Sequence, residues 1–447
     1  MFDDLIDARP ISTRQKLIFA VCLIVLIIDG MDAQMLAFAS PVLLSEWHVT
    51  KAQLAPALAV SLIGTAVGAL IGGFAGDRFG CRRTLIVIVA AFGMTTFGTA
   101  LAGGVTQLIV LRLMSGIGFG VAVPTAMALA SEWCPRALRG QLVLLMSIGT
   151  MLGGTLGGLL AAWLIPAYGW RSIFVAAGAI TAVAAALSMI YLPESLVFLI
   201  RKTRQDEALV WIKRVLGGDV TALPVGGDRK RLDASVPEAG ARLLSSSNLR
   251  VNAGLWVGFF ALSYAAFAYV TWTPAVFVGA GFDVPAAIRC TSVYTFSAVL
   301  GVLVCAVFLP RAGSRMLLLL SIAMGICASI AFPSLLAGGV AKVSALNIAM
   351  VFAGFGGGMS QSTIYALAAT VYPATYRATA LGVCVGISRV GGILSALGGG
   401  VLLEAGGPGG TLFFSVIVGM LVAGLIALAV MNRHTRSAAT HARGLTV

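Results

Sequence analysis

Twelve runs of about twenty apolar residues dominate this 447-residue sequence and leave few folds open to it. A helical run of that length matches the thickness of the hydrocarbon core of a bilayer. Because backbone amides in lipid must be bonded within the protein, such runs form helices. We predict an all-α membrane protein with twelve transmembrane helices, near residues 17–42, 54–75, 84–103, 107–131, 141–164, 170–192, 251–273, 286–309, 316–336, 345–371, 380–403 and 411–431.

The charge distribution predicts the orientation of these helices. Only 11% of the residues are charged, against about 25% in an ordinary soluble domain. If the N-terminus is cytoplasmic, 24 of the 30 basic residues lie inside and four lie outside. The positive-inside rule therefore places both termini in the cytoplasm. The net charge of +13 has the same origin, so it gives no reason to expect a nucleic-acid partner.

An internal repeat divides the chain. At one constant offset, which we call the repeat offset, GIGFG at 116–120 aligns with GFGGG at 354–358, and Gly153–Gly154 aligns with Gly391–Gly392. We predict two pseudo-symmetric six-helix bundles joined by a polar linker that is partly an amphipathic helix and partly disordered. The predicted segments are a cytoplasmic N-terminus (1–16), the first bundle (17–192), the linker (193–250), the second bundle (251–431) and a cytoplasmic tail (432–447).

Five ionisable residues lie within or at the edge of the predicted spans: Asp29, Asp32, Arg112, Glu132 and Arg389. Asp29 and Asp32 are three residues apart and share one helical face near the middle of the bilayer. Two carboxylates so close in a low dielectric repel each other when both are ionised, which favours uptake of a proton. We predict that these two, with Arg112 and Glu132, couple transport to protons. At the repeat offset Asp29 and Asp32 align with Phe267 and Val270, which are apolar. We therefore expect the first half to bind and release the proton.

Arg389, in GISRVGGIL, is the candidate for binding an anionic substrate, because guanidinium pairs with a carboxylate through two parallel hydrogen bonds. We expect Arg112 to pair with Asp32 or Asp29. The alternative for each arginine is a fixed ion pair that only holds two helices together. Further candidate substrate-binding residues are polar or aromatic groups at mid-depth: Gln34, Phe38, Tyr264, Phe267, Ser360, Gln361 and Tyr365. For the aromatic ones, a packing or lipid-facing stripe is an equally good interpretation.

Several motifs carry a family resemblance. GDRFGCRR at 76–83 resembles the signature between the second and third helices of the major facilitator superfamily, and RLMSGIGFG at 112–120 is similar to its fourth-helix signature. SEWCPRALRGQ at 131–141 and PESLVFL at 193–199 resemble elements shared by sugar porters and organic-acid symporters. DGMDAQMLAFASP at 29–41 is similar to the D-G-x-D stretch of the aromatic acid:proton symporter family.

The first of these motifs is expected to act as a gating loop on the cytoplasmic side, through Gly76, Asp77, Arg78, Gly80, Arg82 and Arg83. Its glycines permit a tight turn, and its aspartate can cap a helix or pair with an arginine. Cys81 stands where the family has a basic residue. The corresponding stretch of the second half, PRAGSR at 310–315, has no acid, so its hold on the closed state should be weaker.

The resemblance implies a proton-coupled importer of an aromatic carboxylate such as hydroxybenzoate, benzoate or protocatechuate, working by alternating access. It implies a multi-pass protein of the bacterial inner membrane that functions as a monomer, with protons as the coupling ion and no cofactor or metal. A proton-coupled sugar or aliphatic organic-anion symporter remains an alternative. A drug exporter is less favoured, because the fifth span lacks a Gly-Pro motif. An enzyme or receptor is disfavoured, because the spans hold no histidine or metal-binding motif and no sizeable soluble domain is present.

Overall fold

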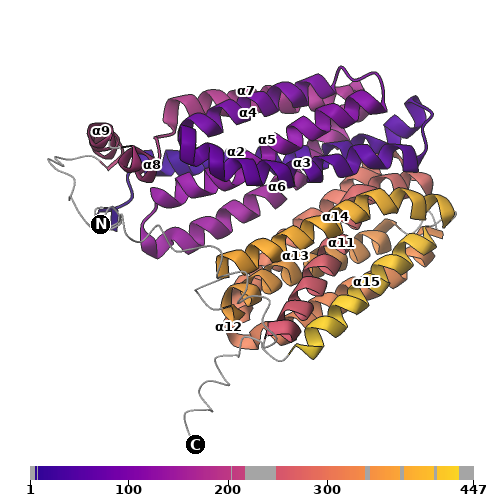
Figure 1. Ribbon diagram of the computed structural model, residues 1–447. Helices are drawn as coiled ribbons and strands as arrows, with labels where there is room; N and C mark the ends of the chain where they lie inside the picture. The colour runs from indigo at the N-terminus through magenta and orange to yellow at the C-terminus, as the bar shows by residue number, and fades with distance from the viewer. Residues whose placement is uncertain are drawn as a thin grey trace, which may run out of the picture. The chain divides into compact units, whose positions relative to one another are not determined.

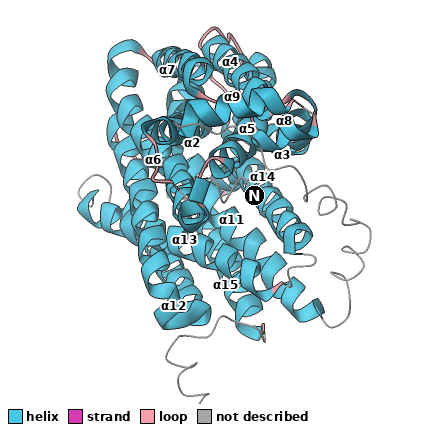
Figure 2. Cartoon of the chain, turned by 90° about the vertical axis from the view of Figure 1, so that its left-hand side faces the viewer, coloured by secondary structure: helices cyan, strands magenta, loops and turns pink. Residues whose placement is uncertain are grey.

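The computed structural model describes residues 6–7, 9–202, 204–216, 248–337, 343–372, 377–406 and 410–431. Most of the predicted linker, and the predicted tail at 432–447, lie outside the described residues. Helices are the only regular elements of the described chain (Figure 2). They are α2 (Thr13–Glu46), α3 (Lys51–Phe79), α4 (Cys81–Thr99), α5 (Val105–Glu132), α6 (Arg136–Tyr168), α7 (Arg171–Tyr191), α8 (Leu196–Arg201), α9 (Gln205–Leu216), α11 (Leu249–Gly279), α12 (Val284–Ala337), α13 (Val343–Val371), α14 (Arg377–Ala405) and α15 (Thr411–Val430).

Eleven of the described helices are long and apolar enough to cross a membrane. One of them, α12, has 54 residues, which at 1.5 Å per residue is about 80 Å and far exceeds one crossing. Its backbone leaves the helical conformation at Gly313, where φ is 75°. Glycine adopts this conformation without a steric penalty. The helix therefore contains both spans predicted near 286–309 and 316–336, and the twelve predicted spans are accounted for.

By proximity, the chain divides into two compact units. Unit 1 comprises Met1–Met35, Val60–Gly157 and Tyr168–Asp233, and unit 2 comprises Leu36–Ala59, Gly158–Ala167 and Ala234–Val447. In unit 1, α4 packs against α5 and α7 (Figure 1). In unit 2, α11 packs against α14 and α15, and α12 packs against α13. The predicted bundle boundaries at 192 and 251 stay a prediction.

Glycines let α3 and α5 approach closely in unit 1. A side-chain carbon at Gly116 would overlap the carbonyl oxygen of Ser61, and one at Gly120 would overlap that of Thr65. Lipid tails are as apolar as the helix surfaces, so the hydrophobic effect does not drive helices together in a bilayer. They associate instead by close packing, which small residues allow. The glycines of the fourth-helix motif are therefore contact points between two helices.

The second copy of this motif makes the same contacts in unit 2. There, a side-chain carbon at Gly354 would overlap the carbonyl oxygen of Tyr294, and one at Gly358 would overlap that of Ala298. The α13 glycines follow those of α5 at the repeat offset, as predicted. Their partners on α12 follow those on α3 at an offset that is five positions shorter, which we call the short offset. The second helix of each half thus follows a shorter offset than the fourth.

The short offset applies to the first helix of each half as well. Gly153 of α6 packs on the carbonyl oxygen of Ile27 of α2 in unit 1. Gly391 of α14 packs on the carbonyl oxygen of Phe260 of α11 in unit 2, with 2.5 Å between an added side-chain carbon and that oxygen. The two glycines are again related by the repeat offset, and their partners by the short offset. Residues of α2 and α11 therefore correspond at the short offset.

This contact register corrects the predicted counterparts of the two first-helix aspartates. Phe267 and Val270 were derived from the repeat offset alone, which does not hold for α2 and α11. At the short offset the aspartates correspond to Leu262 and Ala265, which are buried and apolar. The acidic pair still has no acidic counterpart in the second half.

The short helices α8 and α9 form the described part of the predicted linker. One face of α9 buries Ala208, Ile212 and Val215, while the opposite face carries charged residues, which confirms an amphipathic helix in this segment. The Ser12 hydroxyl donates a hydrogen bond of 2.6 Å to the Val215 carbonyl. This contact fixes α9 against the chain that leads into α2.

Candidate functional site

A buried ion pair joins α2 to α5 inside unit 1. The Arg112 guanidinium donates to Asp32 Oδ2 at 2.7 Å and to the Asp32 carbonyl at 3.0 Å. The two side chains are 1% and 0% exposed. Thr96 of α4 donates to Asp32 Oδ1 at 3.0 Å. Each carboxylate oxygen of Asp32 therefore accepts a hydrogen bond, one of them from a cationic donor.

The pair confirms that Arg112 binds one of the two aspartates. Its Nε has no hydrogen-bond partner among the described residues, although the side chain is almost fully buried. An unpaired buried donor is costly, so the Nε–H can donate a hydrogen bond to a further oxygen at this position. Thr96 was not predicted, because a threonine in an apolar helix gives no sequence signal for its partner.

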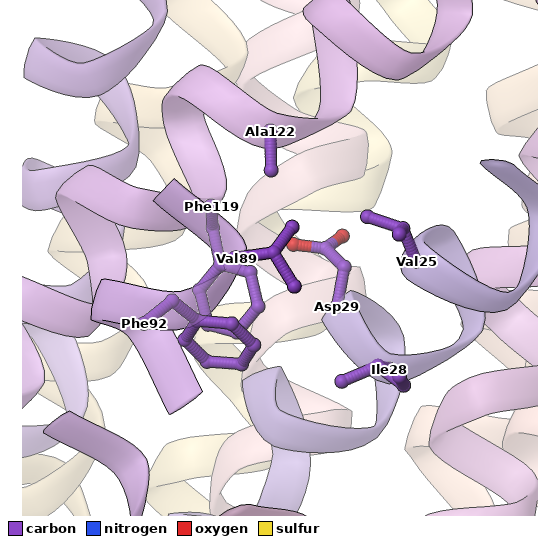
Figure 3. Close-up of a pocket in the computed structure, with 7 residues that line it drawn as sticks. All are labelled: Val25, Ile28, Asp29, Val89, Phe92, Phe119 and Ala122. Carbon is purple, nitrogen blue, oxygen red and sulfur yellow. The ribbon is translucent and has the colours of Figure 1, made fainter. Parts of the chain in front are cut away.

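Asp29 lies one turn before Asp32 and has a different environment. Its carboxylate lines a hollow of about 10 Å³ between α2, α4 and α5, close to the size that holds one water molecule. The other lining residues are apolar: Val25, Ile28, Val89, Phe92, Phe119 and Ala122. Figure 3 shows the carboxylate among these side chains. Asp32 therefore lies in an ion pair with Arg112, and Asp29 lines a hollow that is otherwise apolar.

Gln34 and Phe38 continue α2 beyond the aspartates. Gln34 is 9% exposed, its amide nitrogen lies against Gly154, and its Oε1 accepts no hydrogen bond from a described residue. The ring of Phe38 is fully buried and reaches Gly158. Gln34 thus keeps an acceptor unused, whereas Phe38 fills the protein interior.

Glu132, predicted to couple protons, ends α5 some twenty residues after Arg112, about 30 Å further along the helix. Its carboxylate accepts hydrogen bonds from the Ser195 hydroxyl at 2.9 Å and the Leu196 amide at 3.0 Å. These contacts hold the N-terminus of α8, where an acid is favourable. The structure does not bring Glu132 to the ion pair, and its part in proton coupling stays a prediction.

The predicted gating loop is mostly helical. Gly76 and Arg78 lie in the end of α3, and Arg82 and Arg83 lie in the start of α4. Between the two helices stands Gly80 alone, at φ 94°. Only glycine adopts this conformation readily, and a side chain there would also collide with the Glu194 carboxylate.

Arg82 fastens this turn to the end of α7. Its guanidinium donates to the carbonyls of Leu192 and Met189 at 2.7 Å each, and its backbone amide donates to Glu194 Oε1 at 3.0 Å. Sequence reasoning named Asp77 as the acid of this motif, but the side chain of Asp77 lies outside what the structure describes. The acid it missed is Glu194 of PESLVFL, a motif that was noted without a contact being assigned to it.

Arg389 of α14 contrasts with Arg112. It is half-buried, and no described residue forms an ion pair or a hydrogen bond with its side chain. A half-buried cation within an apolar helix is unfavourable unless an anion balances it. The described part of unit 2 therefore offers a cationic site without a built-in anion.

The other predicted substrate residues of unit 2 divide into two groups. Tyr264 is buried beside Phe260, with 6.5 Å between ring centroids, and Phe267 lies against Gly392. Ser360 bonds to a carbonyl of its own helix, Gly357, so it is not brought toward Arg389. The remaining two, Gln361 and Tyr365, join a polar group.

This polar group includes two serines that sequence reasoning missed. The hydroxyls of Ser263 of α11 and Ser388 of α14 are 2.6 Å apart, and Gln361 of α13 donates to Ser263 at 3.3 Å. Ser388 also interacts with the Tyr365 hydroxyl. Only the position of Ser388, directly before Arg389, could have suggested it from sequence.

Repeated membrane-spanning helices with paired and unpaired intramembrane charges define a polytopic membrane transporter rather than an enzyme. The chain belongs to the Major Facilitator Superfamily, whose family model matches residues 22–395. It is 30% identical to the gallate transporter of Pseudomonas putida, over 98% of this chain and 96% of that one. It is 31% identical to the 4-hydroxybenzoate transporter PcaK of Acinetobacter baylyi, over 95% and 92% of the two chains.

Solved structures of the superfamily share the fold. The partially occluded inward-open xylose transporter XylE from E. coli matches with a TM-score of 0.73 and 16% identity, over 95% of this chain and 99% of that one. The inward-facing bacterial homologue of the lysosomal transporter Spinster matches with a TM-score of 0.72 and 17% identity, over 94% and 97%. At these identities the likeness shows the fold alone.

Proposed function

We propose that this protein imports an aromatic carboxylate together with protons, by alternating access, across a bacterial inner membrane, with both termini in the cytoplasm. The observation that carries the proposal is Arg389, a half-buried cation with no anionic partner among the described residues. A substrate carboxylate supplies that anion and binds guanidinium through two hydrogen bonds. The names of the relatives, transporters of gallate and 4-hydroxybenzoate, support an aromatic acid as the substrate.

Asp29 is the proton carrier in this proposal. Its carboxylate lines a hollow that is otherwise apolar and is close to the size of one water molecule. Asp32 is held by Arg112 and Thr96, so releasing it requires breaking charge-assisted hydrogen bonds. The protein therefore protonates Asp29 from outside, docks the substrate anion on Arg389, and releases both inside, where the pH is higher.

Purified protein in proteoliposomes tests the proposal. Labelled 4-hydroxybenzoate should accumulate when an inward proton gradient is imposed, and an uncoupler should abolish the accumulation. Uptake that is indifferent to the gradient would refute proton coupling. Competition by glucose or succinate rather than by benzoates would refute the substrate class and favour a sugar or aliphatic-anion symporter.

A further inference from the structure

Four polar side chains from three helices of unit 2 form one group beside Arg389. They are Ser263 of α11, Gln361 and Tyr365 of α13, and Ser388 of α14, which we call the hydroxyl cluster. The two serines are 1% and 7% exposed, and their hydroxyls are 2.6 Å apart. Gln361 donates to Ser263 at 3.3 Å, and Tyr365 interacts with Ser388.

Helix packing does not require this cluster. Serine hydroxyls inside helices usually bond to a carbonyl of the preceding turn, as Ser329 does with Gly325 and Ser292 with Ile288. Ser263 and Ser388 make no such bond within the described part of the chain. Their hydroxyls point instead at each other across two helices.

The first half shows what packing alone uses at the corresponding positions. Ser263 corresponds to Gly30 at the short offset, and Ser388 corresponds to Thr150 at the repeat offset. There the glycine packs directly on the Thr150 backbone, and the threonine hydroxyl bonds to the carbonyl of Ser147 in its own helix. The same helix contact is thus made without any hydroxyl pair.

The cluster has hydrogen-bonding capacity left over. Two serine hydroxyls carry two hydrogens, and their mutual bond uses one of them. Gln361 uses one amide hydrogen on Ser263, and its Oε1 accepts no hydrogen bond from a described residue. Apart from the Tyr365 hydroxyl, one serine hydrogen and the second Gln361 amide hydrogen therefore remain as donors, and Gln361 Oε1 remains as an acceptor, so the cluster can donate to a phenol hydroxyl and accept from it.

The cluster lies within reach of a molecule bound at Arg389. Ser388 directly precedes Arg389 on α14, so the Cα atoms of the two residues are about 3.8 Å apart. One small ligand can therefore contact the guanidinium and the cluster together. A ring carboxylate does so by placing its acid on Arg389 and its ring hydroxyl on the serines.

We propose that the hydroxyl cluster selects ring acids that carry a ring hydroxyl over the unsubstituted acids. The inference rests on the proposed function, since it assumes that an aromatic carboxylate binds at Arg389. A site built to bond a substrate hydroxyl discriminates against the analogue without it, because the polar groups of the site then stay unpaired. An apolar pocket of the same shape would bind both.

The test compares dissociation constants of 4-hydroxybenzoate, 3-hydroxybenzoate, benzoate and 4-methoxybenzoate on the purified full-length protein. The wild type should bind the better hydroxybenzoate roughly three- to tenfold more tightly than benzoate, as one hydrogen bond gives. Ser263→Ala and Ser388→Ala should bring the two affinities together, mainly by weakening the hydroxy acid. Ser329→Ala is the matched control, because Ser329 has the same burial and pairs with Tyr269 at 2.6 Å.

The outcomes separate this inference from the function on which it rests. If the wild type binds none of the four acids, the proposed function fails. If it binds them but Ser263→Ala and Ser388→Ala keep the wild-type preference, the hydroxyl cluster is not the selector. If either variant folds poorly, binding of 4-methoxybenzoate to the wild type decides the question. The methoxy group cannot donate a hydrogen bond, so an affinity equal to that of 4-hydroxybenzoate would overturn the inference.

Discussion

Arg112 donates to the carboxylate of Asp32 at 2.7 Å, and both side chains are almost fully buried. We predict that Asp32→Asn lowers stability by about 3–5 kcal/mol, because it leaves the arginine as an uncompensated buried charge. Uptake should be lost as well. The melting temperature in detergent, measured beside gradient-driven uptake, checks both parts.

A double variant separates stability from transport. Asp32→Asn with Arg112→Gln removes both charges, so it should recover most of the lost melting temperature while uptake stays absent. Recovery of uptake in the double variant would mean that the pair only holds α2 to α5. A single variant as stable as the wild type would contradict the ion pair itself.

Asp29→Asn should behave differently from Asp32→Asn. Because Asp29→Asn leaves the Arg112–Asp32 ion pair intact, it should lower the free energy of unfolding less than Asp32→Asn does. Accumulation against a gradient should disappear, whereas exchange of labelled for unlabelled substrate across the membrane should persist. Accumulation at the wild-type level would remove Asp29 from the proton path.

Arg389→Gln should weaken substrate binding without unfolding the protein. No described residue pairs with this side chain, so its removal leaves no buried charge uncompensated. A hydrogen-bonded charge contributes about 1.5–3 kcal/mol, which corresponds to a loss of roughly 10- to 150-fold in affinity. Isothermal titration with 4-hydroxybenzoate measures it.

The exposed Arg311 supplies the control for that experiment, because it also lies in an apolar helix and its only bond among the described residues is to the Val307 carbonyl of its own helix. Arg311→Gln should bind as the wild type does. Equal affinity of Arg389→Gln and the wild type would show that the substrate anion binds elsewhere.

Apolar runs predicted the spans, because membrane helices must satisfy their backbone internally. The intramembrane charges predicted the pairing of Arg112, because an unbalanced charge there is costly. The spacing of the glycine motifs predicted the repeat. Contacts that depend on exact register were less accessible. A single offset misplaced the counterparts of the aspartates by five positions, since the two halves differ in length between their second and fourth helices.

Neutral polar contacts were the hardest to predict. Ser263 and Ser388 lie in apolar helices, and a serine there is as compatible with bonding its own helix as with facing another. Glu194 was visible in PESLVFL, but its contact with Arg82 spans 112 residues and follows from the fold alone. The glycine contacts were partly predictable, because the spacing of the glycines is visible in the sequence but the residues that they contact are not.

The glycine contacts of the two halves supply the last prediction. Gly116→Ala and Gly354→Ala should each destabilise the protein by about 1–3 kcal/mol, because the added carbon overlaps a backbone carbonyl that cannot move aside without separating the helices. Gly386→Ala on α14 is the control, because beyond the adjacent backbone of its own helix no described atom lies within 4 Å of the added carbon. Alanine is the better helix former, so this variant should melt at or above the wild-type temperature.

Thermal unfolding of the three variants in one detergent distinguishes contact from helix propensity. Propensity alone would raise all three melting temperatures, whereas close packing lowers only the first two. Similar losses at Gly116 and Gly354 are expected, since each glycine meets the carbonyl of a corresponding residue, Ser61 or Tyr294. If only one of these two variants has a lower melting temperature, the glycine contact stabilises only one of the two helix pairs. The two pairs would then share their geometry but not their contribution to stability.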